Sequence, residues 1–218
     1  RERGVLSETM FNYMSILGWS PGNDLEIFDK EFAINNFDLK NVLANPAIFD
    51  TQKLLWMNGQ YIREFDEKTF NKIALETIET SLSRELFSEE IERINLILSV
   101  VQERLETLKD LMGQVEFLLD EPFNVDKDEW EEVNSKSAQD YLTNIRNEFK
   151  TMKDFELDKI EAMMREQLKK LDLKPKEGFQ AARVAITGTK ISPPLFESIY
   201  ALGQSSTIAR IAEKIDNL

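Results

Sequence analysis

Arg183 and Ser192 have side chains suited to binding a polyanion or a nucleobase. They lie in the stretch from residue 183 to residue 203, RVAITGTKISPPLFESIYALG. A guanidinium offers a planar fork of donors that fits phosphate oxygens or base edges, and it stacks on an unpaired base. A serine followed by two prolines predicts a capped helix start, where exposed backbone amides and the helix dipole attract phosphates and base acceptors. The stretch therefore favours recognition over bond-breaking chemistry.

Two further arginines are candidates, and every candidate also has a purely structural explanation. Arg165 lies on an expected helix with Ile160, Met164 and Leu168, and its alternative is a solvated charge. Arg104 lies in QERLETLKDL, where Glu103, Glu106 and Lys109 offer local ion pairs. Arg183 could equally be an exposed helix arginine, and Ser192 a helix cap with no other role.

The composition argues against catalysis by this chain. It contains neither histidine nor cysteine, which removes the usual general base, the usual zinc ligands and every Ser-His or Cys-His pair. Acidic pairs such as Glu89/Glu90 and Glu131/Glu132 have no flanking motif, so we interpret them as solvated helix faces. We expect no catalytic residue, no metal site and no cofactor in this chain.

The net charge is −13, which taken alone disfavours nucleic-acid binding. The charge is unevenly distributed. Residues 1–149 hold 15 basic and 30 acidic residues, a balance of −15, whereas residues 150–218 hold 12 and 10, a balance of +2. Acidic helices that keep the protein soluble explain most of the acidity. The mildly basic end is the part that also contains Arg165 and Arg183.

Nearly every segment predicts a helix, and no strand alternation of useful length occurs. Asp50, Asp66 and Asp126 are expected to precede helices, and Ser7 to cap the first one. Further helices are expected over 96–111, 136–150, 155–171, 175–187, 192–202 and 206–218. We expect an all-α, elongated set of small helical bundles, with soft boundaries that give units over 1–65, 66–126 and 127–218.

The sequence lacks the features of a membrane or secreted protein. No run of about 18 apolar residues is present, and the segment RERGVLSETM has no apolar signal-peptide core. The absence of cysteine fits a reducing compartment. We therefore expect a cytoplasmic protein with no membrane contact.

Four stretches, in order, resemble bacterial glutamyl-tRNA synthetases, the class I ligases that attach glutamate to tRNA. They are RERGVLSETMFNYMSILGWS at 1–20, NPAIFDTQKLLWMNGQYIRE at 45–64, VVQERLETLKDLMGQVEFLL at 100–119 and FQAARVAITGTKISPPLFESIYALG at 179–203. The resemblance covers essentially the whole chain. It implies a stem-contact unit at 1–65, followed by two anticodon-binding helical units of the class I synthetase type.

The resemblance also implies roles for individual residues. Arg183, Ser192 and Leu195 correspond to positions that touch the anticodon, and Leu195 would add an apolar platform, although it could be ordinary core. Arg165 lies near an anticodon-contacting arginine of the family. Arg104 matches a position that reads the third anticodon base and helps reject glutamine tRNA. The cluster WMNGQY at 56–61 corresponds to a region resting on the inner corner of the tRNA, although its aromatic residues fit a core role and Asn58-Gly59 an irregular turn.

The family's catalytic motifs, of the H-I-G-H and K-M-S-K-R types, are absent. The chain resembles the C-terminal portion of such a synthetase, so it should be inactive alone, and ATP and Mg would be used by the parent enzyme. The implied partner is glutamate tRNA, and we expect a monomer to bind it. Two alternatives stay open: a free-standing helical adaptor that binds proteins through an apolar groove, and a synthetase paralogue with altered anticodon reading.

Overall fold

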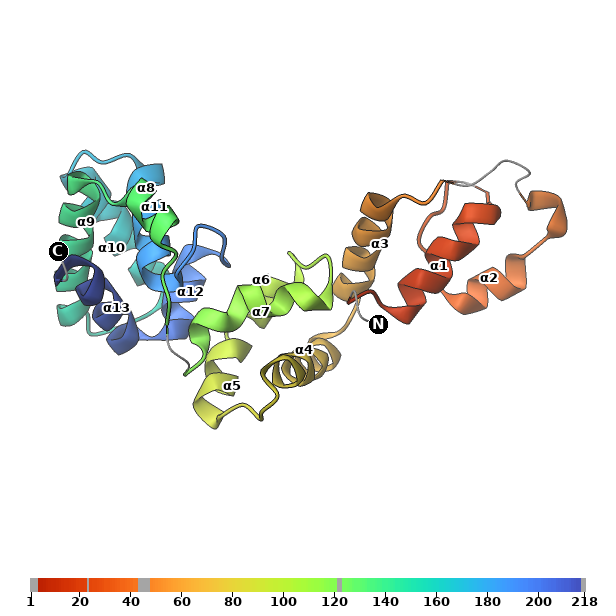
Figure 1. Ribbon diagram of the computed structural model, residues 1–218, viewed down its shortest axis with the longest axis horizontal. Helices are drawn as coiled ribbons and strands as arrows, with labels where there is room; N and C mark the ends of the chain where they lie inside the picture. Colours follow the sequence, from red (N-terminus) through yellow and green to blue (C-terminus); the bar gives the residue numbers. More distant parts are fainter. Residues whose placement is uncertain (1–3, 23, 43–47, 121–122, 217–218) are drawn as a thin grey trace. The chain divides into compact units, whose positions relative to one another are not determined.

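Helices and their connecting loops make up the part of the chain that the structure describes, residues 4–22, 24–42, 48–120 and 123–216 of a computed structural model (Figure 1). Within these ranges the one strand-like pairing is an isolated antiparallel bridge between Trp19 and Val42. The predicted all-α class is thus confirmed. The chain divides into two compact units, and each takes in two segments of sequence. Unit 1 is residues 1–84 and 101–112, and unit 2 is residues 85–100 and 113–218.

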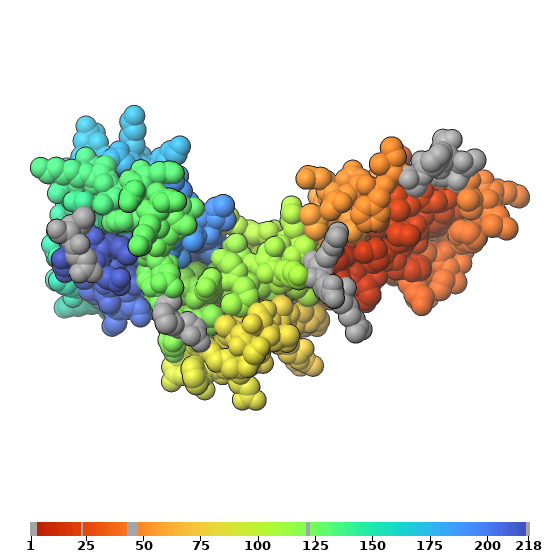
Figure 2. Space-filling view, viewed as in Figure 1, coloured from red at the N-terminus to blue at the C-terminus, as the bar shows by residue number. Residues whose placement is uncertain are grey.

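Unit 1 is built on four α-helices. They are α1 (Ser7–Gly18), α2 (Lys30–Asn36), α3 (Thr51–Arg63) and α4 (Glu67–Leu82), with the short 3-10 turns η1 (Leu39–Asn41) and η2 (Leu108–Asp110). Helix α1 packs against α2 and α3, and α4 packs against η2. The α1–α3 contact buries Tyr13, Leu54 and Met57, while Trp19, Phe28 and Ala33 form a second cluster beneath α2. In the space-filling view the segments of α1, α2 and α3, in red and orange, lie packed side by side (Figure 2).

Unit 2 contains the longer helical array. Its complete elements are α5 (Ser88–Asn95), η3 (Glu116–Leu118), α8 (Lys127–Val133), α9 (Lys136–Thr151), α10 (Leu157–Lys170), α11 (Pro175–Thr187), α12 (Leu195–Leu202) and α13 (Gln204–Asp216). It also holds most of two short helices, α6 (Leu98–Gln102) and α7 (Leu111–Val115), which cross the boundary between the units. Helix α11 contacts α8, α9, α10, α12 and α13, so it is the central element. Its buried alanines and Gly178 allow this crowding. A Cβ added at Gly178 would meet Leu168 Cδ2 at 2.4 Å, within overlap distance.

The predicted helix starts that depend on an aspartate cap are confirmed. The side chain of Asp50 accepts from Lys53 N, that of Asp66 from Thr69 N, and that of Asp126 from Glu129 N. Each cap satisfies an amide that has no partner inside its own helix. The predicted helix at 175–187 coincides with α11.

Three local predictions are wrong. The apolar run from residue 96 to residue 111 is broken after α6 by a turn and by η2, because the side chain of Asp110 accepts from Thr107 N and closes a tighter local loop. Ser7 is the first residue of α1 and not its cap, since Leu6 occupies the cap position. Helix α12 begins at Leu195 after Pro194, so Ser192 does not cap it.

The three-part division at residues 66 and 127 stays a prediction. No described helix has both the length and the apolarity needed to cross a lipid bilayer.

Candidate nucleic-acid interface

Arg183 holds the loop between α11 and α12. Its Nη1 donates to Ser192 Oγ at 2.5 Å, to the Ser192 carbonyl at 3.2 Å and to the Pro193 carbonyl at 2.5 Å. Arg183 as a whole residue is half-buried, so it is not the exposed helix arginine of the structural alternative. One edge of the fork therefore shapes the loop of which Ser192 is part.

The side chains of Ser192 and Leu195 are buried, each with 4% of its surface exposed. Ser192 Oγ accepts from Arg183 and lies close to the Pro193 carbonyl. Leu195 opens α12 with its side chain in the core. Both residues thus have structural roles, and their contacts with nucleic acid stay predictions.

Arg165 lies on a surface formed by two phenylalanines that the sequence analysis missed. Its guanidinium carbon is 5.4 Å from the ring centroid of Phe179 on α11 and 5.5 Å from that of Phe196 on α12. The two rings pack edge to face with centroids 5.3 Å apart. Glu161, one turn earlier on α10, accepts from Arg165 Nε at 2.7 Å. We call Arg165, Phe179 and Phe196 the aromatic-arginine cluster.

A signal for this cluster was present in the sequence. Phe179 precedes Arg183 by four residues and so shares its side of α11, and Phe196 directly follows Leu195. The arginine side chain is 51% exposed, which leaves a face open for a stacked group. The alternative of a simple solvated charge does not describe Arg165.

The five lysines from Arg165 to Lys190 divide into two sets. Lys170 pairs with Glu166 at 2.9 Å, and Lys190 pairs with Glu132. The hydrogen bond from Lys170 lowers the pKa of the Glu166 carboxyl below its usual value. Lys169, Lys174 and Lys176 are exposed and form no ion pair within the described part of the chain. These three lysines, at the junction of α10 and α11, offer positive charge for phosphate groups.

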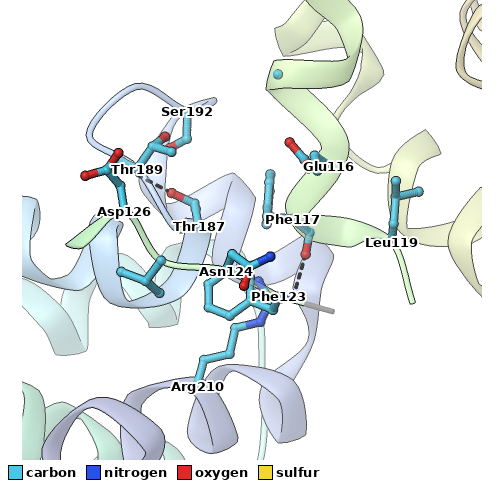
Figure 3. A pocket seen from close by; sticks show the side chains of 12 residues that line it. Glu116, Phe117, Leu119, Phe123, Asn124, Asp126, Thr187, Thr189, Ser192 and Arg210 are labelled. Atoms are coloured by element: carbon cyan, nitrogen blue, oxygen red, sulfur yellow. Dashed lines mark hydrogen bonds between the residues drawn. The ribbon is translucent and has the colours of Figure 1, made fainter. Parts of the chain in front are cut away.

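A cavity of about 320 Å³ lies beside the α11–α12 loop (Figure 3). Figure 3 shows Thr187, Thr189 and Ser192 on one wall and Phe117 with Arg210 on another. Arg210 donates to the carbonyls of Ile186 and Phe117, both at 2.6 Å, and its guanidinium carbon is 3.7 Å from the ring centroid of Phe123. Burial lowers the pKa of Arg210 to about 10. Arg210 therefore serves to join α13, α11 and η3.

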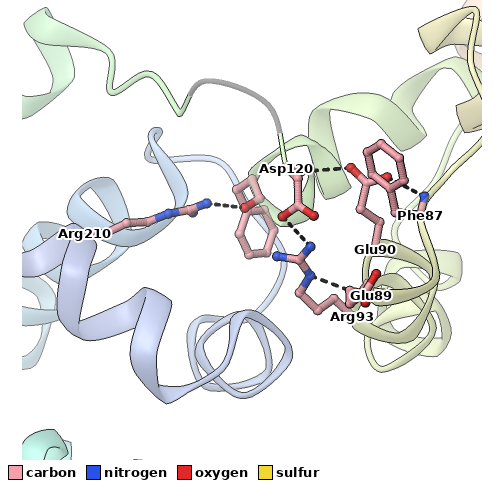
Figure 4. A network of polar contacts seen from close by, with 7 residues as sticks. Phe87, Glu89, Glu90, Arg93, Asp120 and Arg210 are labelled. Carbon is pink, nitrogen blue, oxygen red and sulfur yellow. Dashed lines mark hydrogen bonds and ion pairs between the residues drawn. The ribbon is translucent and has the colours of Figure 1, made fainter.

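One acidic pair predicted to be a solvated face includes a buried carboxylate. Glu90 is fully buried, and its two oxygens accept from Phe87 N and Asp120 N, both at 2.9 Å (Figure 4). Arg93 Nη2 donates to Asp120 Oδ1 at 2.6 Å. The prediction is wrong for Glu90 because its carboxylate is buried and accepts one bond from the start of its own helix and one from the segment that follows η3. In the other pair, Glu132 binds Lys190.

Arg104 is exposed on a loop that α3 holds in unit 1. Three backbone carbonyls of that loop meet α3: Glu103 O accepts from Arg63 Nη1 at 3.2 Å, Glu106 O accepts from Asn58 Nδ2 at 2.7 Å, and Leu105 O would lie 2.9 Å from a Cβ at Gly59. Arg104 makes no ion pair within the described residues, so the local ion-pair alternative is not realised. Its guanidinium stays open to solvent.

The cluster WMNGQY lies inside α3, so the predicted irregular turn at Asn58-Gly59 is wrong. Met57 and Asn58 are fully buried, whereas Trp56 is 45% exposed. The loop that follows α6 packs against this part of the helix, where Asn58 binds the Glu106 carbonyl and Gly59 leaves room for the Leu105 carbonyl.

Four of the five predicted residues thus come together in unit 2: Arg165, Arg183, Ser192 and Leu195, on or between α10, α11 and α12. Arg104 belongs to unit 1. Within the described residues, no group of three or more carboxylates could hold a metal ion. The arrangement supplies donors, positive charge and ring faces, which bind and orient a ligand.

The family is decided by the match of residues 60–215 to a model described as an anticodon binding domain. The chain belongs to this family. The match includes Arg104 as well as the aromatic-arginine cluster and the α11–α12 loop.

Curated relatives of this chain include glutamate–tRNA ligases. That of Symbiobacterium thermophilum is 34% identical over 220 residues, 97% of this chain and 45% of the relative. That of Kocuria rhizophila is 35% identical over 217 residues, 97% of this chain and 43% of the relative. The chain therefore spans less than half the length of these relatives.

Two solved structures share the fold. A glutamate tRNA ligase from Elizabethkingia meningosepticum, solved with its amino acid, matches with a TM-score of 0.84 and 24% identity over 100% of this chain and 42% of its own. The glutamate-tRNA synthetase of Elizabethkingia anophelis matches with a TM-score of 0.79 and 23% identity, over 99% and 42% of the two chains.

Proposed function

We propose that this chain binds glutamate tRNA through the anticodon loop and the inner stem. The observation that carries the proposal is the aromatic-arginine cluster beside Arg183, in a chain of the anticodon-binding family. Unpaired loop bases are recognised by stacking on rings or guanidinium planes and by hydrogen bonds to their edges. Arg165 offers such a plane, and Arg183 offers a donor fork at the neighbouring loop.

Three exposed lysines, Lys169, Lys174 and Lys176, support the same function because they can bind phosphate groups. The three side chains are exposed, and Lys174 and Lys176 line a shallow cavity at the start of α11. Phosphate contacts set the position of an RNA, whereas contacts to base edges and faces read its sequence. The unit thus combines both kinds of contact within α10, α11 and their junction.

This chain would contribute binding energy and choice of tRNA, and not the ligation chemistry. We assign the use of ATP and Mg to the part of the relatives that this chain does not span. We further propose that the chain acts as a monomer.

Salt-dependent binding of glutamate tRNA tests the proposal. With about three phosphate contacts, the plot of log affinity against log salt should have a slope of about −2. Replacing Lys169, Lys174 and Lys176 by glutamine should reduce that slope strongly, whereas Lys68→Gln on α4 serves as the control. A wild-type chain that shows no salt-dependent binding of this tRNA, with or without the rest of a ligase attached, would overturn the proposed function.

We predict that Arg104→Gln relaxes rejection of glutamine tRNA by about tenfold, because a guanidinium fork facing base acceptors discriminates by about 1–3 kcal/mol. The loop carbonyls stay bound to α3, so the chain should remain folded. The ratio of affinities for the two tRNAs is the measurement, and Lys109→Gln on the neighbouring η2 is the matched control. Unchanged discrimination would remove Arg104 from tRNA selection.

One observation favours the competing candidate, a protein-interaction module. An apolar groove of about 460 Å³ lies between α1 and α2 in unit 1, and the exposed side chains of Met14, Ile34 and Phe37 line it. Residues 4–42 hold six acidic and two basic residues, so an apolar polypeptide with basic flanks fits this surface. A module of this kind would bind such a peptide through the groove and would show no salt-dependent affinity for tRNA.

A further inference from the structure

The loop from Gly188 to Pro194 is held from two sides. Arg183 binds it at Ser192 and Pro193. On the other side, the Gly188 carbonyl accepts from Asp126 N at 2.9 Å. Gly188 has a φ of +88°, and a Cβ there would meet Asn124 O at 2.6 Å, so only glycine allows this close approach. The segment before α8 is therefore packed directly against the loop, and Figure 3 shows Asp126 near Thr187 and Thr189.

Helix α8 supplies a carboxylate to the middle of the same loop. Glu129 Oε2 accepts from the backbone amide of Lys190 at 2.5 Å. The side chain of Asp126 caps the helix by accepting from Glu129 N at 2.9 Å, which fixes the first turn of α8 and so the base of the Glu129 side chain. A bond from an amide to a carboxylate is stronger than one between neutral groups.

The next turn of α8 neutralises the positive charge of the lysine in the loop. Glu132 pairs with the Lys190 ammonium, whose side chain is 24% exposed. The one lysine in the loop is thus bound to α8 and is not directed at a ligand. Glu129 and Glu132 of α8 therefore bind the loop itself, one through the Lys190 amide and the other through the Lys190 ammonium.

We propose that Glu129 is a positioning residue for recognition of the anticodon. It holds the Lys190 amide, and through the short loop it places Ser192 and Pro193 where Arg183 binds them. The proposal rests on the proposed function of tRNA binding. It assigns selectivity to a residue that touches no nucleotide.

Hydrogen exchange of the free chain tests the first half of the proposal. Glu129→Ala should speed exchange of the Lys190 amide by about tenfold or more, because a bond to a charged acceptor is lost. Glu129→Gln keeps an acceptor oxygen and should retain most of the protection. Glu132→Ala removes only the ion pair and should leave this amide protected. Equal protection in wild-type chain and Glu129→Ala would overturn the proposal without reference to tRNA.

Binding of glutamate tRNA and of the same tRNA with altered anticodon bases tests the second half. Glu129→Ala should reduce the affinity ratio of the two tRNAs by about tenfold, with an unchanged salt slope since no phosphate contact is removed. Glu129→Gln should restore the ratio to within about threefold of the wild-type value. Faster exchange with an unchanged ratio would make Glu129 purely structural and would overturn the positioning role, while the proposed function would stand. A wild-type chain that binds neither tRNA would overturn both.

Discussion

Asn58→Leu is expected to lower the free energy of unfolding of unit 1 by about 3 kcal/mol. Asn58 is fully buried in α3. Its Oδ1 accepts from Leu6 N at 2.8 Å, and its Nδ2 donates to Glu106 O at 2.7 Å and to Gly4 O at 3.4 Å. Leucine has a similar volume but satisfies none of these groups. Each buried backbone group left unpaired costs about 1–3 kcal/mol.

Urea unfolding followed by tryptophan fluorescence measures this effect. Trp19 and Trp56 belong to unit 1 and Trp130 to unit 2, so a Trp130→Phe background reports on unit 1 alone. This separation is needed because two compact units can unfold in separate transitions. Gln52→Leu, on an exposed position of the same helix, is the matched control and should change the midpoint little.

The same substitution should also affect the loop that displays Arg104. Without the Asn58 amide, one of the three carbonyl contacts between that loop and α3 is lost. We expect faster amide exchange from residue 103 to residue 107. An unfolding midpoint equal to that of Gln52→Leu would contradict the assigned role of Asn58.

Arg183→Ala is expected to weaken binding of glutamate tRNA by about 1–3 kcal/mol, or about tenfold to a hundredfold. Two effects combine. The substitution removes a donor fork from the proposed base-reading surface, and it releases the carbonyls of Ser192 and Pro193 from the bonds that shape the loop. Arg183→Lys keeps the charge but lacks the planar fork, so it should recover only part of the affinity.

Equilibrium binding at fixed salt, with cognate and anticodon-altered tRNAs, distinguishes base reading from phosphate binding. Arg146→Ala is the matched control because Arg146 is also partly buried in unit 2, where it pairs with Asp216 at 3.1 Å. If Arg183→Ala lowered the affinity for all the tRNAs equally, Arg183 would be a phosphate contact and would not read a base. Equal losses for Arg183→Ala and Arg146→Ala would point to a general effect of stability.

Much of the fold could be predicted because it depends on neighbours in the sequence. The aspartate caps at Asp50, Asp66 and Asp126 bind amides three residues ahead, and that pattern is local. The start of α12 could not be predicted in the same way. Ser192 precedes two prolines, yet its hydroxyl binds Arg183, nine residues earlier, and leaves no cap.

The residues of the candidate site likewise fall into those that the sequence indicated and those that only the folded structure brings together. Arg183 and Arg165 were identifiable as cationic side chains, and the four ordered stretches indicated the family. The two phenylalanines under Arg165 were not found, because α10, α11 and α12 come together only after folding. Glu90 looked like a solvated helix charge, although it accepts a bond from the backbone amide of Asp120 in another segment. The bond between Glu129 and the Lys190 amide also joins residues far apart in the sequence, and no local pattern indicated it.

The all-α class, the aspartate-capped helix starts, the uneven charge and the resemblance to the ligases all follow from the sequence alone. Which polar side chains are buried, and which groups they bind, depends on the tertiary structure. Asn58 donates a hydrogen bond to the loop that carries Arg104. Arg183 donates to the α11–α12 loop, and Glu129 accepts from the same loop at Lys190. The physical reason is that periodicity and capping act over a few residues, whereas a buried polar group needs a partner that only long-range packing brings near.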